Sequence, residues 1–153
     1  MPFQMFHERC PDIAFLEVRS ITIRNNPDYP LLADEYAFLE MYCNDAGCDC
    51  RRVYFSIVAK SNPRCVLANI SWGWESLEFY RTWGSFPKSK KDVKMMKGPI
   101  LAPMTEQSAL APELLKLAQD LLLPSPEYVE RIKQHYELFR KTIKGPKHSP
   151  FKA

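Results

Sequence analysis

Period-two hydrophobic patterns in the first half of the chain, separated by short connections, are the feature that most constrains the fold. Residues 35–43, 52–59 and 65–72 each show this strand pattern. Residues 15–24 are rich in β-branched side chains and also predict a strand, with a change of face near Arg19 that indicates a bulge. Short connections join strands as antiparallel hairpins, because parallel neighbours need a long crossover. We therefore predict an antiparallel meander of about four strands.

The second half of the chain has the periodicity of amphipathic helices. Residues 75–83 predict a short helix. Residues 110–121 and 125–143 carry apolar side chains at steps of three and four, and Pro124 separates these two segments. The stretch 87–103 is expected to be a loop. The predicted fold class is therefore α+β, an antiparallel sheet packed on two or three C-terminal helices.

The length of 153 residues fits one domain. We expect residues 1–145 to form a single α+β metal-binding domain and residues 146–153 to form a disordered tail. The N-terminal residues do not show a basic segment followed by an apolar one, so no signal peptide is predicted. Because no stretch has the ~20 apolar residues of a membrane span, we predict a cytoplasmic protein with no membrane partner.

Three cysteines, Cys43, Cys48 and Cys50, form a C-x4-C-x-C cluster in the connection between two predicted strands. The residues from Asn44 to Gly47 favour a tight turn, which directs several thiolates toward one point. Thiolates in a tetrahedral arrangement suit zinc, and a hairpin tip has little apolar core of its own. We therefore predict a structural site with zinc as the cofactor.

Other uses of these cysteines stay open at this point. Disulfides are disfavoured, because the count of five cysteines is odd and the expected compartment is reducing. The thiols could instead serve as inert small side chains. One of them could also be a redox or nucleophilic group, with Arg51 and Arg52 lowering its pKa.

A closed tetrahedral zinc site needs a fourth ligand. We predict His135 for this position, because it lies at the flank of the apolar face of the predicted helix 125–143. A helix packed on the sheet could bring this imidazole to the hairpin tip. His7 and Cys10, spaced as H-x2-C, are the reserve pair if the N-terminal arm folds over the tip.

Other groups could also complete the site. Asp45 or Asp49 could ligate the metal, and a water molecule in the fourth position would open the site to chemistry. Cys65 is disfavoured, since it lies at the far end of the next hairpin from Cys43. Two strands of about seven residues would separate the two sites by ~20 Å.

The region from residue 88 to residue 97 carries an excess of basic charge on a chain whose formal net charge is +3. The residues concerned are Lys88, Lys90, Lys91, Lys94 and Lys97, against one acidic residue, Asp92. Such a patch can bind phosphate or an acidic partner, although many are simply solvated. Nucleic-acid binding is therefore kept as an alternative, without support from a recognised binding motif.

Aromatic residues gather where the last predicted strand meets the following helix. The cluster contains Trp72, Trp74, Tyr80 and Trp83. It is either a stacking platform for a ligand or, as we favour, the packing between sheet and helices. Catalytic and nucleotide-binding motifs such as G-x-S-x-G, the P-loop and H-E-x-x-H are absent from the sequence.

The segment 42–53, YCNDAGCDCRRV, resembles a family of uncharacterised bacterial proteins. Residues 71–76, SWGWES, with Phe79 and Tyr80, and residues 134–139, QHYELF, are similar to the same family. This resemblance implies a cytoplasmic metal-binding domain with no assigned activity. The family contains both the cysteine segment and the segment with His135, which is compatible with a shared site.

The resemblance covers roughly residues 35–145. This chain differs from the family at its C-terminus. Its members often carry a C-terminal SEC-C metal-binding motif, which requires cysteines after a C-x-C pair. This chain has no cysteine after Cys65. A role that depends on the SEC-C motif is therefore not implied here.

The sequence thus predicts a zinc-binding domain of unassigned cellular role, used as a binding or adaptor module for an unknown protein partner. The alternative is an enzyme that uses a zinc-bound water or a reactive cysteine of the same cluster. A nucleic-acid-binding protein is the second alternative. The number of ligands separates the first two, because a Cys3His shell is structural whereas three protein ligands and a water are typical of catalysis.

Overall fold

The computed structural model describes residues 2–144 of the chain. The strands in this part are β1 (Phe3–Met5), β2 (Arg19–Ile23), β3 (Asp34–Cys43), β4 (Arg52–Ala59), β5 (Asn62–Gly73) and β6 (Ile100–Leu101). The helices are α1 (Phe6–Arg9), α2 (Pro11–Glu17), α3 (Leu77–Thr82), α4 (Lys90–Lys97), α5 (Ala111–Leu117), the π-helical turn η1 (Ala118–Leu122) and α6 (Pro126–Lys144). The predicted tail, residues 146–153, lies outside the described residues.

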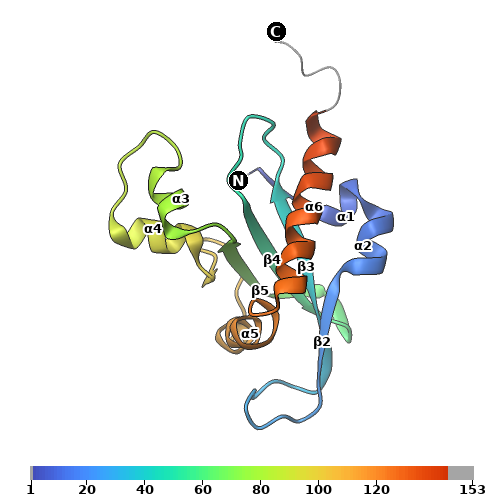
Figure 1. The fold of residues 1–153 in the computed structure, drawn as a ribbon. Coiled ribbons are helices and arrows are strands. Elements are labelled where there is room, and N and C mark those ends of the chain that lie inside the picture. Colours follow the sequence, from blue (N-terminus) through green and yellow to red (C-terminus); the bar gives the residue numbers. More distant parts are fainter. Residues whose placement is uncertain (1, 145–153) are drawn as a thin grey trace.

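All strands of the described part belong to one antiparallel sheet, in the order β1-β3-β4-β5-β6. The long hairpins β3-β4 and β4-β5 form its centre, as the sequence predicts (Figure 1). Two short strands share the outer edge of β3, with β2 pairing residues 34–38 and β1 pairing residues 41–43. The α+β class is confirmed, whereas the predicted count of about four strands is wrong because β1 and β6 are too short for pattern recognition.

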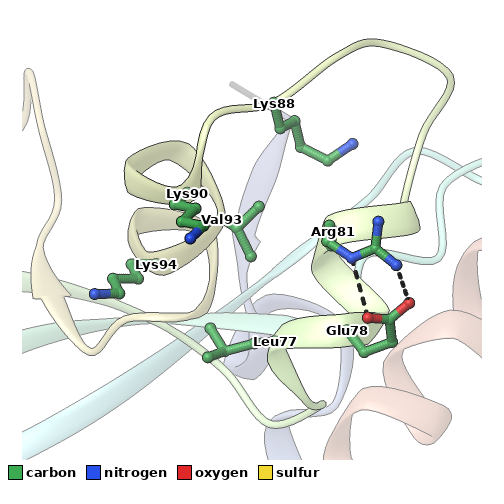
Figure 2. A pocket seen from close by; sticks show the side chains of 7 residues that line it. All are labelled: Leu77, Glu78, Arg81, Lys88, Lys90, Val93 and Lys94. Carbon is green, nitrogen blue, oxygen red and sulfur yellow. Dashed lines mark hydrogen bonds and ion pairs between the residues drawn. The ribbon is translucent and has the colours of Figure 1, made fainter.

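Two predicted segments have a different structure. Residues 15–24 are not one bulged strand, because the helix α2 runs to Glu17 and β2 begins at Arg19. Pro11 starts this helix, as its fixed φ favours the first helical turn. The expected loop 87–103 contains α4, which lies beside α3 (Figure 2). Its N-terminus is stabilised by a capping box that the sequence analysis missed.

The core lies between the sheet and a layer of helices dominated by α6, which crosses β3 and β4 (Figure 1). Phe38 and Phe55 from the sheet belong to the same buried cluster as Ile132 and Phe139 from α6. Alternate residues of β3 face this core and their neighbours are only half-buried. The helix therefore covers one face of the sheet, as the α+β prediction requires.

One acidic residue, Glu40, occupies a core-facing position of β3 and is fully buried. Its Oε1 lies 2.6 Å from Nδ1 of His135 in α6, and Tyr42 donates a hydrogen bond of 2.7 Å to the same oxygen. Nε2 of His135 lies 2.8 Å from Oε1 of Glu17 at the end of α2. With a carboxylate at each nitrogen, the imidazolium form donates two hydrogen bonds. This network joins α2, β3 and α6.

The protonation of His135 follows from these contacts. Burial alone would lower the pKa of His135, but the hydrogen bonds and charges of Glu40 and Glu17 outweigh it and raise the pKa above the usual value. Phe6 stacks on the imidazole with ring centroids 4.4 Å apart, which keeps water away from it. The histidine is therefore a buried cation that neutralises a buried carboxylate.

We expect His135→Leu to lower the free energy of unfolding by about 3–5 kcal/mol, because it leaves the Glu40 carboxylate buried without its counter-ion. Denaturant unfolding measures this loss. The exposed histidine on α1 provides the control, and His7→Leu should stay within about 0.5 kcal/mol of the wild type. Equal stability of the two variants would contradict the ion pair.

The same pair predicts a dependence on pH. A group whose pKa is raised on folding stabilises the protein fully below its unfolded pKa, about 6.5 for histidine, and loses this contribution as the pH rises through the folded value. The stability difference between the wild type and His135→Leu should therefore be largest just below pH ~6.5 and shrink at alkaline pH. A difference that grows with pH would show that His135 is neutral in the folded protein.

Candidate metal centre

The connection between β3 and β4, here called the cysteine loop, comprises residues 43–51. Asp45 shapes its first turn, because its Oδ1 accepts a hydrogen bond of 2.9 Å from the backbone of Gly47 and its carbonyl accepts one of 3.0 Å from Cys48. This local turn brings Cys48 back beside Cys43, the last residue of β3. The sequence is sufficient for this step, since all the groups involved are close along the chain.

The three sulfur atoms of Cys43, Cys48 and Cys50 all lie within 4.8 Å of one another. Cys43 and Cys50 are buried, and Cys48 is half-buried. Tetrahedral zinc with Zn–S bonds of ~2.3 Å requires sulfur atoms ~3.8 Å apart. The cluster therefore fits a thiophilic ion with only a small contraction, and soft thiolates are the ligands that zinc prefers.

Two thiols of the cluster, those of Cys50 and Cys43, resist ionisation when no cation is present. Burial raises the pKa of Cys50 to about 12, with a further contribution from the neighbouring Cys48 and Cys43. Burial also raises the pKa of Cys43, against a hydrogen bond from the backbone of Asp45 that lowers it. A bound divalent cation reverses this balance, because its charge stabilises the thiolates that repel each other. The raised pKa values of Cys50 and Cys43 also argue against either of these two as a nucleophile.

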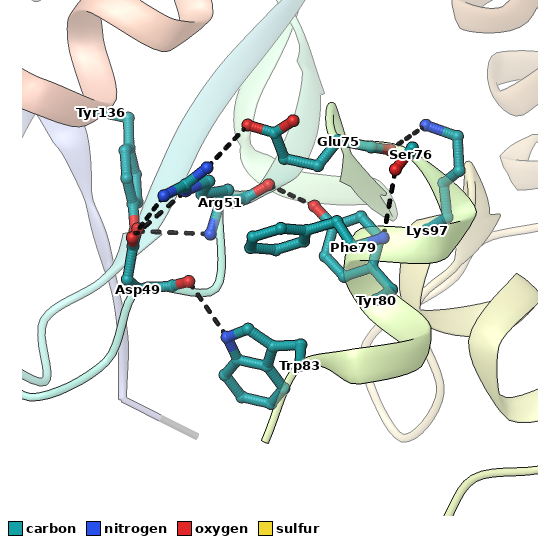
Figure 3. A network of polar contacts seen from close by, with 9 residues as sticks. All are labelled: Asp49, Arg51, Glu75, Ser76, Phe79, Tyr80, Trp83, Lys97 and Tyr136. Atoms are coloured by element: carbon teal, nitrogen blue, oxygen red, sulfur yellow. Dashed lines mark hydrogen bonds and ion pairs between the residues drawn. The ribbon is translucent and has the colours of Figure 1, made fainter. Parts of the chain in front are cut away.

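Helices far away in the sequence hold the second half of the cysteine loop. Asp49 contacts α6 and the residue that follows α3, since its Oδ1 accepts a hydrogen bond of 2.8 Å from Tyr136 of α6 and its carbonyl accepts one of 3.0 Å from the indole of Trp83 (Figure 3). The hydroxyl of Tyr80 in α3 donates a hydrogen bond of 2.6 Å to the carbonyl of Arg51. The loop is therefore fixed between α3 and α6.

Arg51 ends the loop and joins it to the next segment of the chain. Its guanidinium pairs with Asp49 at 3.0 Å and with Glu75 at 3.1 Å, and it lies over the ring of Phe79 at 4.8 Å (Figure 3). The backbone of Arg51 has a φ of 50°, which turns the chain sharply into β4. Gly73 allows Tyr80 to reach this turn, because a Cβ there would collide with the tyrosine ring.

The structure does not bring His135 to the cysteines. Both of its ring nitrogens contact carboxylates of Glu40 and Glu17, and it lies outside the group of ligand atoms formed by the cysteines. The prediction of a Cys3His site is therefore corrected. Consecutive residues of a helix point about 100° apart, so Tyr136, the next residue, faces the cysteine loop while His135 faces β3.

The other proposed ligands also lie elsewhere. His7 is exposed on α1, and Cys10 is half-buried between α1 and α2. Asp45 serves the turn and Asp49 serves Tyr136 and Arg51. Within residues 2–144, no fourth histidine, cysteine or acidic side chain joins the three cysteines. A metal at this point would keep one position for a ligand other than these side chains.

Some residues that hold the loop escape sequence analysis. Arg140 of α6 is buried and donates a hydrogen bond of 3.3 Å to the carbonyl of Ala46, and Tyr136 lies on the same helix face. The signal that could have placed α6 correctly is Glu40, an acid among the apolar core-facing residues of a strand. Such a residue requires a buried cationic partner, and His135 is the partner it has.

The aromatic cluster proves to be packing. Tyr80 and Trp72 are buried, and Trp74 packs its ring edge-on against Tyr136 with centroids 5.0 Å apart. The indole nitrogen of Trp83 is used by the cysteine loop. The rings therefore join β5, α3 and α6 around the loop, which leaves little free face for stacking a ligand.

Comparisons with known proteins found no family model, no curated protein and no solved structure that matches this chain. The resemblance to uncharacterised bacterial proteins stays a prediction. None of the helices within residues 2–144 is both long and apolar enough to cross a membrane.

The hydrogen bond between α6 and the loop can be tested with two variants of one helix. Tyr136→Phe removes the bond to Asp49 and should lower the free energy of unfolding by about 1 kcal/mol. Tyr128→Phe removes a buried hydroxyl that has no hydrogen-bond partner, so it should be neutral or stabilising. Thermal unfolding of both variants measures these changes. Equal losses of unfolding free energy in the two variants would contradict a specific role for Tyr136.

Proposed function

We propose that this protein is a zinc-binding domain in which Cys43, Cys48 and Cys50 hold the ion and the metal has a structural role. The observation that carries the proposal is the convergence of three thiols within 4.8 Å at the tip of a hairpin. Four residues of this loop, Asn44, Asp45, Gly47 and Asp49, are exposed. The tip thus has little apolar contact of its own, and a metal would supply the missing stabilisation.

The consequence of metal binding would extend beyond the hairpin tip. The ion would join the end of β3 to the residue before Arg51, the point where the loop meets α3 and α6. Burial raises the pKa of Cys50, and the charge of Arg52, next in the chain after Arg51, opposes this effect in part. A Zn²⁺ with three thiolates carries one negative charge, which this guanidinium would balance. The proposed role is therefore to fix a surface on which a protein partner binds.

The metal content of the purified protein tests this proposal. We expect one zinc per chain by elemental analysis and native mass spectrometry, lost in Cys48→Ser and kept in Cys65→Ser. Cys65 is exposed on β5 and lies outside the cluster, so its variant is a matched control. A chelator should lower the unfolding midpoint of the wild type and of Cys65→Ser only, because a ligand that binds the folded state stabilises it. Zinc-free protein after purification and reconstitution would refute the site.

An enzyme with a metal-bound water is the second candidate. It is favoured by one observation, the absence of a fourth protein ligand from the cysteine group within residues 2–144. Substitution with cobalt separates the two proposals, because the absorption of Co²⁺ reports its ligands. A spectrum that changes on addition of azide would show an exchangeable position and favour the enzyme. A spectrum that does not respond would favour the structural role.

A further inference from the structure

A groove lies between α3 and α4, in the basic region of the chain. It has a volume of about 240 Å³. Leu77 and Val93 form its apolar part, and Lys88, Lys90 and Lys94 surround them (Figure 2). None of these residues belongs to the cysteine loop.

The apolar part of the groove lacks a cover. Leu77 is 47% exposed, whereas Val93 is buried. The volume is below the ~300–1,000 Å³ of pockets that enclose cofactors or metabolites. The hollow thus suits an anchoring side chain of a peptide better than a whole small molecule.

The side chains around the groove carry an excess of positive charge. The acid that lines it, Glu78, pairs with Arg81, so it does not neutralise the lysines. Within residues 2–144, Lys90 and Lys94 have no ion pair, and both are exposed. Lys88 donates to the carbonyls of Trp83 and Phe86 and is partly engaged. Two unpaired cations therefore border an apolar hollow.

The groove is also firmly attached to the sheet. Lys97, at the end of α4, donates hydrogen bonds to the carbonyls of Gly73 and Glu75. Ser89 and Asp92 cap the start of the same helix by reciprocal hydrogen bonds. A helix that is anchored at its C-terminal end and capped at its N-terminus loses little conformational entropy when a partner binds.

The lysines favour a partner with negative charge, and the apolar hollow indicates which kind of negatively charged partner fits. Single-stranded nucleic acid is held by aromatic side chains on which bases stack, but the hollow is aliphatic. An acidic peptide with an apolar residue satisfies both features, because its carboxylates pair with lysines while the apolar side chain is removed from water.

We propose that the groove between α3 and α4 binds an acidic segment of a partner protein, with an apolar side chain of that segment in the hollow and its carboxylates at Lys90 and Lys94. This inference rests on the binding role proposed above and not on the bound metal. It names the contact surface and the chemistry of the partner.

Fluorescence anisotropy with a short labelled peptide that alternates glutamate and leucine tests the proposal on the full chain. We expect binding at low salt that is roughly tenfold weaker in the double variant Lys90→Glu/Lys94→Glu. The matched control, Lys60→Glu/Lys141→Glu, changes the net charge by the same amount at exposed positions outside the groove and should bind as the wild type does. Leu77→Gln should weaken binding without a change of charge on the protein.

Variants of the peptide show whether its carboxylates and its apolar side chains both contribute to binding. A peptide with glutamine for glutamate, and another with alanine for leucine, should each bind more weakly than the parent peptide. The proposal is overturned by equal loss in the two double variants, by no binding at low salt, or by a single-stranded RNA oligonucleotide that binds more tightly through the same lysines. Zinc content measured on the same samples keeps the two proposals separate, since a lack of zinc would refute the metal site alone and a lack of peptide binding would refute the groove alone.

Discussion

The buried ion pair between His135 and Glu40 sets how α6 lies on the sheet, and the rest of the molecule follows from that position. A carboxylate in an apolar core is stable only beside a cation, so α6 must turn His135 toward β3. Tyr136 then faces the cysteine loop, and Arg140, one turn further, contacts the same loop. The ion pair and the buried apolar side chains of α6, Ile132 and Phe139, thus require the same rotation of a long helix.

The short helix α3 connects two surfaces of different character. Tyr80 and Trp83 donate hydrogen bonds to the cysteine loop, whereas Leu77 and Arg81 line the groove with α4. Tyr80 and Leu77 therefore point from α3 toward different surfaces, and Trp83 directly follows the helix. Because α3 has only six residues, it lies next to both surfaces.

The parts of the fold that sequence analysis predicted are those with long, regular patterns. The strands β3, β4 and β5 and the helix α6 lie close to the predicted ranges 35–43, 52–59, 65–72 and 125–143. The errors concern short elements, where few residues carry the pattern. Residues 15–24 contain both a helix end and a strand, and their β-branched side chains hid the boundary. In the lysine-rich stretch, α4 buries only Val93, so its apolar periodicity is too weak to detect.

The cysteine cluster was predicted from the sequence alone, because Cys43, Cys48 and Cys50 are close along the chain and a local turn at Asp45 brings Cys48 back to Cys43. The position of His135 was decided only by the tertiary structure. Its distance from the cysteines depends on how α6 is rotated over β3, and a carboxylate 95 residues away in the sequence controls that rotation. Local patterns define which face of a helix is apolar, but pairing between distant polar groups requires the packed core in which an unpaired charge is too costly to keep.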